Sequence, residues 1–204
     1  FTVQGAGLVV TGAVFSGTVQ VGDRLVLSPQ GTEVRVRSIH AQNREAETGT
    51  VGERCALNIT GPDLKREDVH RGGWVMDAAI HLPVARFDAR LRLLADEARP
   101  LRHWTPVHVH LGAAEVPGRV AILGGEAILP GSDGLCQIVL PRRIGALRGD
   151  GFILRDQSAR RTIAGGRVID PFPPARGRAK PERIEYIEAM EEEAAEDALL
   201  KLLD

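Results

Sequence analysis

The sequence predicts a mostly β protein with two consecutive antiparallel β-barrels, a Pro/Arg-rich linker and a C-terminal α-helical segment. Three observations support this fold class. Short runs in which apolar and polar residues alternate fill most of positions 1–170. Turn signals separate these runs about every 8–12 residues, as in small barrels and sandwiches. Helical periodicity appears only after a group of prolines that begins at Pro171, so no crossover helices separate the strands.

Residues 1–80 are predicted to form the first barrel. Its expected strands lie in the runs GLVVTGAVF, GTVQVGDRLVL, TEVRVRSIHA, ERCALNIT and GGWVMDA. Gly22-Asp23 separates two of these strands, because such a pair adopts the positive φ of a tight turn. Pro62–Gly73 is the helix-like piece of this region, and we expect it to form a single turn or a loop because Gly72-Gly73 ends it early.

Residues 81–172 are predicted to form the second barrel. From Arg86 to Leu93, charged residues alternate with apolar ones, which is the pattern of a half-buried strand. Further strands are expected in TPVHVHLGAA, GRVAIL, LCQIVLPRR, DGFILRDQ and RTIAGGRVID. The last two runs form a pair joined by a short polar turn.

Residues 173–204 are predicted to be a linker and the start of a helical domain. The prolines of PFPPARGRAKP cannot join a β-ladder or a helix interior, so this stretch is expected to be extended. Pro181 suits the first position of a helix, and apolar residues then recur at near-helical spacing. Two alternatives stay open: the helix packs on the chain's own barrel, or it begins a further helical domain.

The net charge of −1 conceals an uneven distribution. Residues 171–204 hold nine acidic and five basic side chains, a net charge of −4, which leaves +3 for residues 1–170. The segment from Arg142 to Lys180 contains ten basic residues and three acidic ones. This basic field could meet phosphates, or it could be a solvated strand face, and composition does not decide between the two.

Composition argues against several classes of protein. No apolar stretch is long enough to span a bilayer, so we expect a cytoplasmic protein without a membrane partner. Cys55 and Cys136 lie in runs that indicate buried strands, where packing is favoured over the alternative of a disulfide.

Motifs for catalysis and for bound cofactors are not found. Gly5, Gly7 and Gly12 lack the Lys-Ser/Thr pair of a phosphate loop and the spacing of a dinucleotide fingerprint. His108 and His110 would point the same way from one strand, but no third ligand shares their alternation, so no metal site is predicted. We therefore expect neither catalytic residues nor a cofactor in this chain.

The opening stretch FTVQGAGLVVTGAVFSGTVQVGDRL resembles the second domain of translational GTPases of the elongation factor Tu superfamily. Within that superfamily, RVRSIHAQN, WTPVHVHLGAAEVPGRV and the Pro/Arg-rich passage into a helix are similar to bacterial selenocysteine-specific elongation factors. The resemblance implies two barrels of the translation-factor type, domains II and III, plus the start of a winged-helix region. GTP and magnesium would bind in a GTPase domain outside this sequence, so the chain alone is expected to have no enzyme activity.

The same resemblance implies the partners. They are selenocysteyl-tRNA, the ribosome at recoded UGA codons, and a hairpin of the messenger RNA that is read by domains outside this sequence. The first barrel would hold the aminoacyl end of the tRNA, and the second would contact its acceptor and T arms. The alternative is a barrel module that docks mainly on the ribosome or on a protein.

Site residues follow from the resemblance by position. Arg37 and His40 would supply cations to the selenocysteine pocket, since the selenol is largely an anion at neutral pH. Being three positions apart, they lie on opposite faces of a regular strand and share a pocket only if the strand bulges or ends near Ser38. The alternative is that Arg37 braces its own barrel. The implied contacts of the tRNA 3′ end are Phe1, Val3, Gly5 and Val9, and those of its phosphates are Arg142, Arg143, Arg160 and Arg161.

Overall fold

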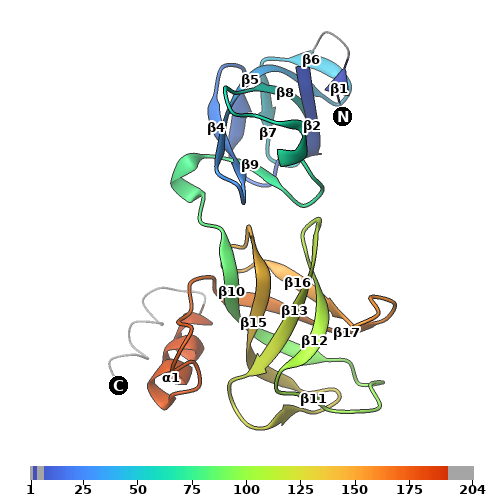
Figure 1. Cartoon of the computed structure of the whole chain (residues 1–204), viewed down its shortest axis with the longest axis vertical. Helices are drawn as coiled ribbons and strands as arrows, with labels where there is room; N and C mark the ends of the chain where they lie inside the picture. The colour runs from blue at the N-terminus through green and yellow to red at the C-terminus, as the bar shows by residue number, and fades with distance from the viewer. Residues whose placement is uncertain (1, 4–6, 193–204) are drawn as a thin grey trace. The chain divides into compact units, whose positions relative to one another are not determined.

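The computed structural model describes residues 2–3 and 7–192. Contacts divide the chain into two compact units, Phe1–His81 and Leu82–Asp204. Figure 1 shows that strands dominate both units and that a single α-helix, α1, follows them in the described part of the chain. The predicted fold class of two barrels, a linker and a helical segment is confirmed.

Nine strands are found among the described residues of the first unit. Six of them follow one another in a sheet in the order β1-β2-β8-β5-β4-β9, β6 adds to β5, and β3 and β7 form a separate ribbon. All pairs are antiparallel. The strands are β1 (Thr2–Val3), β2 (Gly7–Ala13), β3 (Thr18–Gln20), β4 (Arg24–Ser28), β5 (Thr32–Ala41), β6 (Arg44–Ala46), β7 (Thr48–Thr50), β8 (Arg54–Thr60) and β9 (Trp74–Met76).

One apolar core unites the sheet and the ribbon of the first unit. Val19 of the ribbon lies in the same buried cluster as Val36, Ile39 and Ile59 of the sheet, so the two pieces wrap around a common interior. Two 3₁₀ turns, η1 (Arg66–Asp68) and η2 (Ala78–Ile80), complete the unit. The expectation of a single turn within residues 62–73 is confirmed by η1. Gly22 has a φ of 98°, as the predicted tight turn requires.

The second unit is a closed six-stranded barrel in the order β10-β15-β13-β12-β16-β17. A two-stranded ribbon of β11 and β14 lies outside this ladder. The strands are β10 (Val84–Leu93), β11 (Leu101–Arg102), β12 (Thr105–Leu111), β13 (Ala114–Ile122), β14 (Ala127–Ile128), β15 (Asp133–Ile144), β16 (Gly151–Arg155) and β17 (Thr162–Asp170). The expected strand pair joined by a polar turn is therefore present as β16 and β17.

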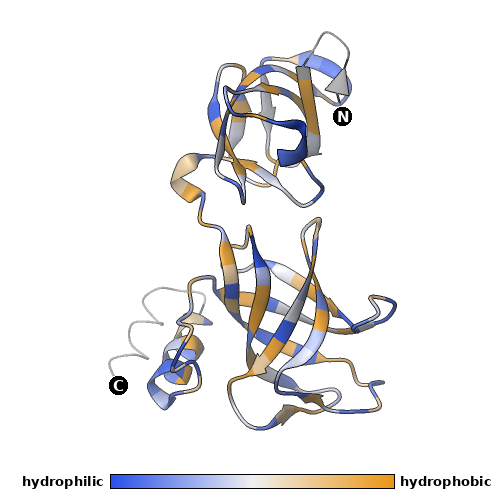
Figure 2. Cartoon of the chain, in the orientation of Figure 1, coloured by the Kyte–Doolittle hydropathy of each residue, from blue (hydrophilic) through white to orange (hydrophobic). Residues whose placement is uncertain are grey.

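Side chains that point into the second barrel fill it without charged groups. Figure 2 shows hydrophobic and hydrophilic residues interspersed along its strands, and the inward set includes Phe87, Leu91, Ile138 and Leu154, none of which is measurably exposed. The rings of Phe87 and Phe152 meet edge to face with centroids 5.3 Å apart. Cys136 belongs to this core, and both cysteines are buried and free, so the packing interpretation is confirmed.

Helix α1 (Pro181–Met190) packs on the second unit. Its Ile187 is fully buried in a small cluster with Leu123, Leu135 and Ile169. The predicted start at Pro181 is confirmed. The described part of the helix packs on the chain's own barrel, whereas the start of a further helical domain stays a prediction. Positions 193–204, the rest of the predicted helical segment, lie outside the described residues. Within the described ranges, no helix has the length and apolar character needed to cross a membrane.

Gly166 of β17 is required by close packing inside the barrel wall. A Cβ atom at this position would come within 2.6 Å of the ring of Phe152 and even closer to the carbonyl oxygen of Arg90. We therefore expect Gly166→Ala to lower the free energy of unfolding of the second unit by about 1–3 kcal/mol, the cost of forcing extra volume into a packed core. Chemical denaturation measures this difference.

Gly165→Ala is the matched control, because the nearest atom to its added Cβ would be a carbonyl oxygen at an ordinary 3.6 Å. The control should stay within about 0.5 kcal/mol of the parent chain. Equal stability losses in both variants would contradict the packing argument.

Candidate nucleic-acid interface

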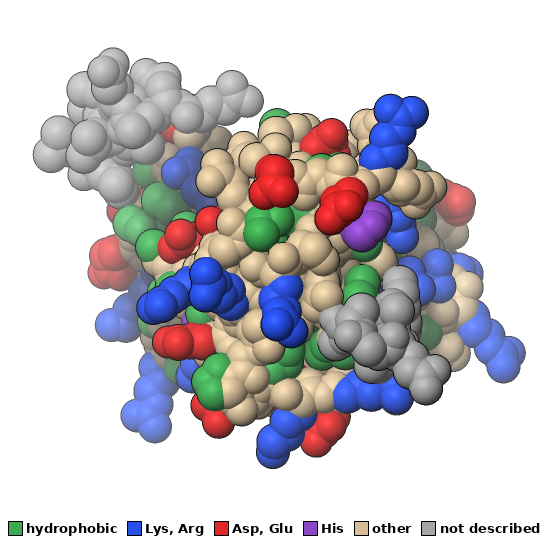
Figure 3. Space-filling view, turned by 90° about the horizontal axis from the view of Figure 1, so that it is seen from above, with side chains coloured by type: hydrophobic (Ala, Val, Ile, Leu, Met, Phe, Trp, Pro, Cys, Tyr) green, Lys and Arg blue, Asp and Glu red, His purple; other side chains and the backbone are tan. Residues whose placement is uncertain are grey.

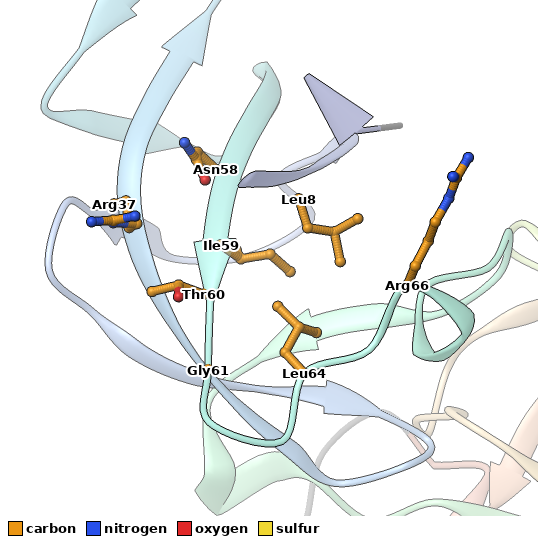
Figure 4. A pocket seen from close by; sticks show the side chains of 8 residues that line it. All are labelled: Leu8, Arg37, Asn58, Ile59, Thr60, Gly61, Leu64 and Arg66. Atoms are coloured by element: carbon orange, nitrogen blue, oxygen red, sulfur yellow. The ribbon is translucent and has the colours of Figure 1, made fainter. Parts of the chain in front are cut away.

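A pocket opens beside β5 and β8 of the first unit. Its volume is about 430 Å³, and its lining consists of Leu8, Arg37, Asn58, Ile59, Thr60, Gly61, Leu64 and Arg66. Figure 4 shows the apolar side chains of Leu8, Ile59 and Leu64 close together in the middle, with Arg37 and Arg66 on opposite sides of them. The pocket thus combines an apolar floor with two cationic side chains, a combination suited to a small group that carries negative charge.

Arg37 reaches this pocket because β5 bulges at its position. The pairing of β5 with β8 shifts register between Val36 and Ser38, which leaves Arg37 as the extra residue. Val36 and Ile39 are both buried, whereas Arg37 and His40 are both exposed. The condition that the sequence set for a shared face, a bulge near Ser38, is therefore met.

His40 lies further along the outer face of the sheet than the pocket does. It pairs with Ala56, whereas Ser38 pairs with Asn58 of the pocket lining. His40 is not among the lining residues. The structure therefore brings Arg37 to the pocket and leaves His40 beside it on the same sheet face.

The predicted contacts of the tRNA 3′ end are only partly described. Val9 of β2 pairs with Asn58, so it belongs to the same row of the sheet as Ser38, and its side chain is buried. Val3 pairs with Gly7 in the short β1. Phe1 and Gly5 lie outside the described residues. Val9 therefore lies beside the pocket, whereas the remaining predicted contacts belong to the chain terminus.

Arg37 has no acceptor of its own in the described part of the first barrel. Among residues 7–192, it donates no hydrogen bond and forms no ion pair. An arginine that braced its strands would need such a partner. The guanidinium is therefore available to a ligand in the pocket.

The four arginines predicted to hold phosphates lie at two ends of the second barrel. Ile144, next to Arg143, pairs with Val84 at the start of β10. Ala164, just after Arg161, pairs with Leu93 at the end of the same strand. Nine positions of strand separate these levels, about 30 Å at about 3.3 Å per residue. The structure therefore keeps Arg142 and Arg143 apart from Arg160 and Arg161.

These arginines also differ in their partners. Arg161 forms an ion pair with Glu97, and Arg142 donates to the carbonyl oxygen of Glu115 at 3.1 Å. Arg143 and Arg160 are exposed, and their side chains form no hydrogen bond or ion pair with another described residue. Single arginines at separate positions are therefore the available phosphate contacts of the second unit. Figure 3, seen from above the first unit of Figure 1, shows basic and acidic side chains interspersed over the face in view.

Asp156 organises the turn that presents Arg160. Its carboxylate accepts hydrogen bonds from the Ser158 hydroxyl at 2.8 Å and from the backbone N–H groups of Arg160 and Arg161 at 2.9 and 3.2 Å. These bonds hold the pKa of Asp156 below its ordinary value of 3.8, and the bond from Ser158 has the largest effect.

The predicted site residues do not include Trp104, an exposed tryptophan of the second unit. Trp104, between β11 and β12, is 42% exposed and has a left-handed φ of 67°. The guanidinium groups of Arg119 and Arg178 lie 5.9 and 5.8 Å from its ring centroid, and the His103 ring stacks at 5.9 Å. We call this group the Trp104 cluster. Exposed aromatic rings flanked by cationic side chains can stack on RNA bases and pair with phosphates. The run Arg102-His103-Trp104 is the sequence feature from which this site could have been predicted.

The two strand histidines do not gather a ligand set. His108 and His110 lie on β12, and Nδ1 of His108 is 3.6 Å from the carboxylate of Glu115. Residues 2–3 and 7–192 contain no group of three or more His, Cys, Asp or Glu side chains arranged to hold a metal ion.

Two family models match the chain. Residues 7–76 match "Elongation factor Tu domain 2", and residues 86–175 match "Selenocysteine-specific elongation factor, beta-barrel domain". The matched segments correspond to the first and the second unit in turn.

Several curated proteins are similar over most of the chain. A selenocysteine-specific elongation factor of Escherichia coli is 40% identical over 190 residues, which is 93% of this chain and 29% of that protein. One of Haemophilus influenzae is 36% identical over 204 residues, 99% of this chain and 32% of that protein. Elongation factor Tu 2 of Streptomyces avermitilis is 31% identical, over 82% of this chain and 43% of that protein. The chain therefore spans about a third of the length of the selenocysteine-specific relatives.

A solved structure shares the fold. Translation elongation factor SelB from Methanococcus maripaludis, in its apo form, superposes with a TM-score of 0.70 at 23% sequence identity. The superposition covers 86% of this chain and 41% of that one. The arrangement of strands is therefore common to both proteins.

The hydrogen bonds to Asp156 predict a pH dependence of the turn that presents Arg160. Because the folded pKa is lowered, the carboxylate stabilises the turn fully above its unfolded pKa, and this contribution is lost as the pH falls through the folded pKa. An NMR titration should place the midpoint of Asp156 below 3.8. Asp156→Asn should speed amide exchange at Arg160 and Arg161 at neutral pH.

Ser158→Ala serves as a graded control, since it removes one of the three bonds. It should raise the midpoint of Asp156 and leave both backbone bonds in place. A midpoint of Asp156 at 3.8 or above in the parent chain would refute this account of the turn.

Proposed function

Because the chain belongs to the family of selenocysteine-specific elongation factors, we propose that it is the part of such a factor that grips selenocysteyl-tRNA. The intact factor would deliver this tRNA to the ribosome at recoded UGA codons in a GTP-dependent manner. In this proposal, residues 1–80 hold the aminoacyl end, residues 81–172 contact the acceptor and T arms, and residues 173–204 lead into a winged-helix region. The messenger RNA hairpin would be bound by winged-helix domains outside this sequence.

The observation that carries the proposal is the position of Arg37. It sits on a bulge at the pocket, it is exposed, and it has no partner among the described residues. A selenol is largely ionised at neutral pH, whereas the hydroxyl of serine is not, so a nearby cation favours the selenocysteyl group. The floor of Leu8, Ile59 and Leu64 would remove water from one side of the selenium and strengthen this preference.

The terminal adenosine is assigned to the neighbouring row of the sheet. Val9, although buried, pairs with Asn58 of the pocket lining, and Val3, Gly5 and Phe1 precede it in the sequence. We place His40 at the edge of this contact because it lies on the same face as Arg37. A nucleoside held there would leave the aminoacyl group within reach of the pocket.

Arg143 and Arg160 are the leading candidates for phosphate contacts in the second unit, because both are exposed without a partner among the described residues. Arg142 and Arg161 would need to exchange existing partners for RNA. Since the two pairs lie at levels nine strand positions apart along β10, they would contact different stretches of the RNA.

Nucleotide hydrolysis is assigned to a part of the factor outside this sequence. The residues here do not fit a GTP site, since Gly12 lies within strand β2 and is followed by Ala13-Val14 and not by the lysine and hydroxyl of a phosphate loop.

One observation favours the alternative of a docking module. Phe15 is 68% exposed and meets the ring of Trp74 edge to face at 5.1 Å, and Val51 nearby is 61% exposed. Exposed aromatic side chains are enriched at protein interfaces. A first unit that bound a protein with these residues, without discriminating between aminoacyl esters, would fit that alternative.

Arg37→Ala tests the proposed pocket. In the intact factor with GTP, it should weaken protection of the selenocysteyl ester against hydrolysis more than protection of a seryl ester on the same tRNA. We expect the ratio of selenocysteyl to seryl protection to fall roughly fivefold, which corresponds to about 1 kcal/mol. The effect is this small because the exposed position allows water to screen the contact. The tRNA contacts common to both esters cancel in the ratio.

Arg35→Ala is the matched control, because Arg35 is exposed on the same strand but does not line the pocket. It should leave the ratio of the two esters unchanged. Equal losses for both esters in Arg37→Ala would refute the pocket, and the selecting charge would then lie elsewhere in the factor.

Arg160→Ala tests the phosphate contact. It should weaken tRNA binding across esters and lower the slope of log K against log salt by about 1, the release of one counterion. Arg92→Ala is the control, since Arg92 lies near the same end of the barrel but is engaged with Asp133 at 3.1 Å. A salt slope that is unchanged in Arg160→Ala would remove this turn from the interface.

A further inference from the structure

Arg183 of helix α1 reaches into the wall of the second barrel. Its Nη2 atom lies 2.6 Å from Oδ2 of Asp88 and also pairs with Asp170. The Asp88 side chain is fully buried and that of Arg183 is 14% exposed. A residue of the helix thus forms ion pairs with carboxylates of both β10 and β17.

Gln137 of β15 joins the linker to the same network. Its Nε2 atom donates to Oδ1 of Asp88 at 2.8 Å and to the carbonyl oxygen of Pro174 at 3.3 Å. Three strands, the linker and the helix therefore share one buried polar network around Asp88.

The far end of α1 is also fastened by arginines. Arg148 donates to the carbonyl oxygens of Met190 and Glu192, and Arg90 forms an ion pair with Glu191. The final carbonyl groups of a helix carry partial negative charge, so a guanidinium there is favourable. Ile187, fully buried, adds an apolar contact between the two ends.

The linker carries a further arginine to the Trp104 cluster. Arg178 lies 5.8 Å from the Trp104 ring centroid, and its Nη2 atom donates to the carbonyl oxygen of Ala175 at 3.1 Å. Its position therefore depends on the path of the linker across the barrel.

Arg183 supplies the cation that offsets the burial of the two carboxylates. Burial raises the pKa of Asp88, and the bonds from Arg183 and Gln137 oppose that effect. Without Arg183, two buried carboxylates would lose their cation, and an uncompensated buried charge is strongly unfavourable. Release of the segment would return Asp88 to water and leave the barrel itself intact.

We propose that residues 171–192 form a strap that Arg183 fastens to the second barrel, and that the fastened strap adds Arg178 to the RNA contact surface around Trp104. The first part rests on the intramolecular contacts alone. The second part rests on the proposed function. The strap is then part of the tRNA-binding surface and not a flexible linker.

Hydrogen exchange in the intact factor tests the fastening. Arg183→Met should make the amides of Ile184–Met190 exchange at least tenfold faster, while those of β12 and β13 stay protected. Arg176→Met is the control, since Arg176 is an exposed linker arginine that forms no hydrogen bond or ion pair with another described residue, and it should change nothing. Combining Arg183→Met with Asp88→Asn and Asp170→Asn should restore protection, because no buried charge remains unpaired. Unchanged exchange in Arg183→Met would overturn the strap.

Binding of tRNA for selenocysteine to the same factor with GTP tests the second part. Arg178→Ala and Arg183→Met should each weaken binding about three- to tenfold, and the double variant should be no weaker than Arg183→Met alone. Undiminished binding in Arg178→Ala would overturn the role of Arg178, whatever the exchange data show. If the unaltered factor does not bind this tRNA, the proposed function fails, whereas the exchange result still decides the strap.

Discussion

The alternation of side chains along antiparallel strands is the constraint on which both units depend. Every second residue points inward, and a small interior admits only apolar side chains in close contact. In the second unit, the six strands close the ladder and bury Phe87 and Ile138 completely. Charged residues must then lie on the outer wall, where they are available to other parts of the chain or to a ligand.

A single departure from this alternation creates the candidate site of the first unit. The bulge at Arg37 inserts one residue into β5, so the positions before and after it keep their apolar side chains inside while Arg37 and His40 both face out. Bulges redirect side chains in this way without disturbing the core. An exposed guanidinium beside the apolar floor of a pocket is the result, and the proposed selection of an anionic aminoacyl group rests on it.

The outer wall of the second barrel is used in a different way. Asp88 points away from the core, yet it is fully buried because the linker and α1 cover it. A carboxylate in that position is tolerated only with a cation, and the helix supplies Arg183. The same path of the linker carries Arg178 to Trp104, so the packing of the helix and the composition of the exposed cluster are linked.

Local sequence determined the fold class, the strands, the short turn in residues 62–73 and the start of α1 at Pro181, because alternation, glycine turns and a proline at the first helical position act over a few residues. The ordered motifs also indicated the family. Tertiary structure decided the rest. The separation of Arg143 from Arg160 follows from strand direction in the closed barrel, and the bulge at Arg37 from its pairing with β8. Arg183 and Asp88 lie 95 positions apart in the sequence. They pair because the closed ladder and the covering strap bring them together, and spacing along the chain does not predict such a contact.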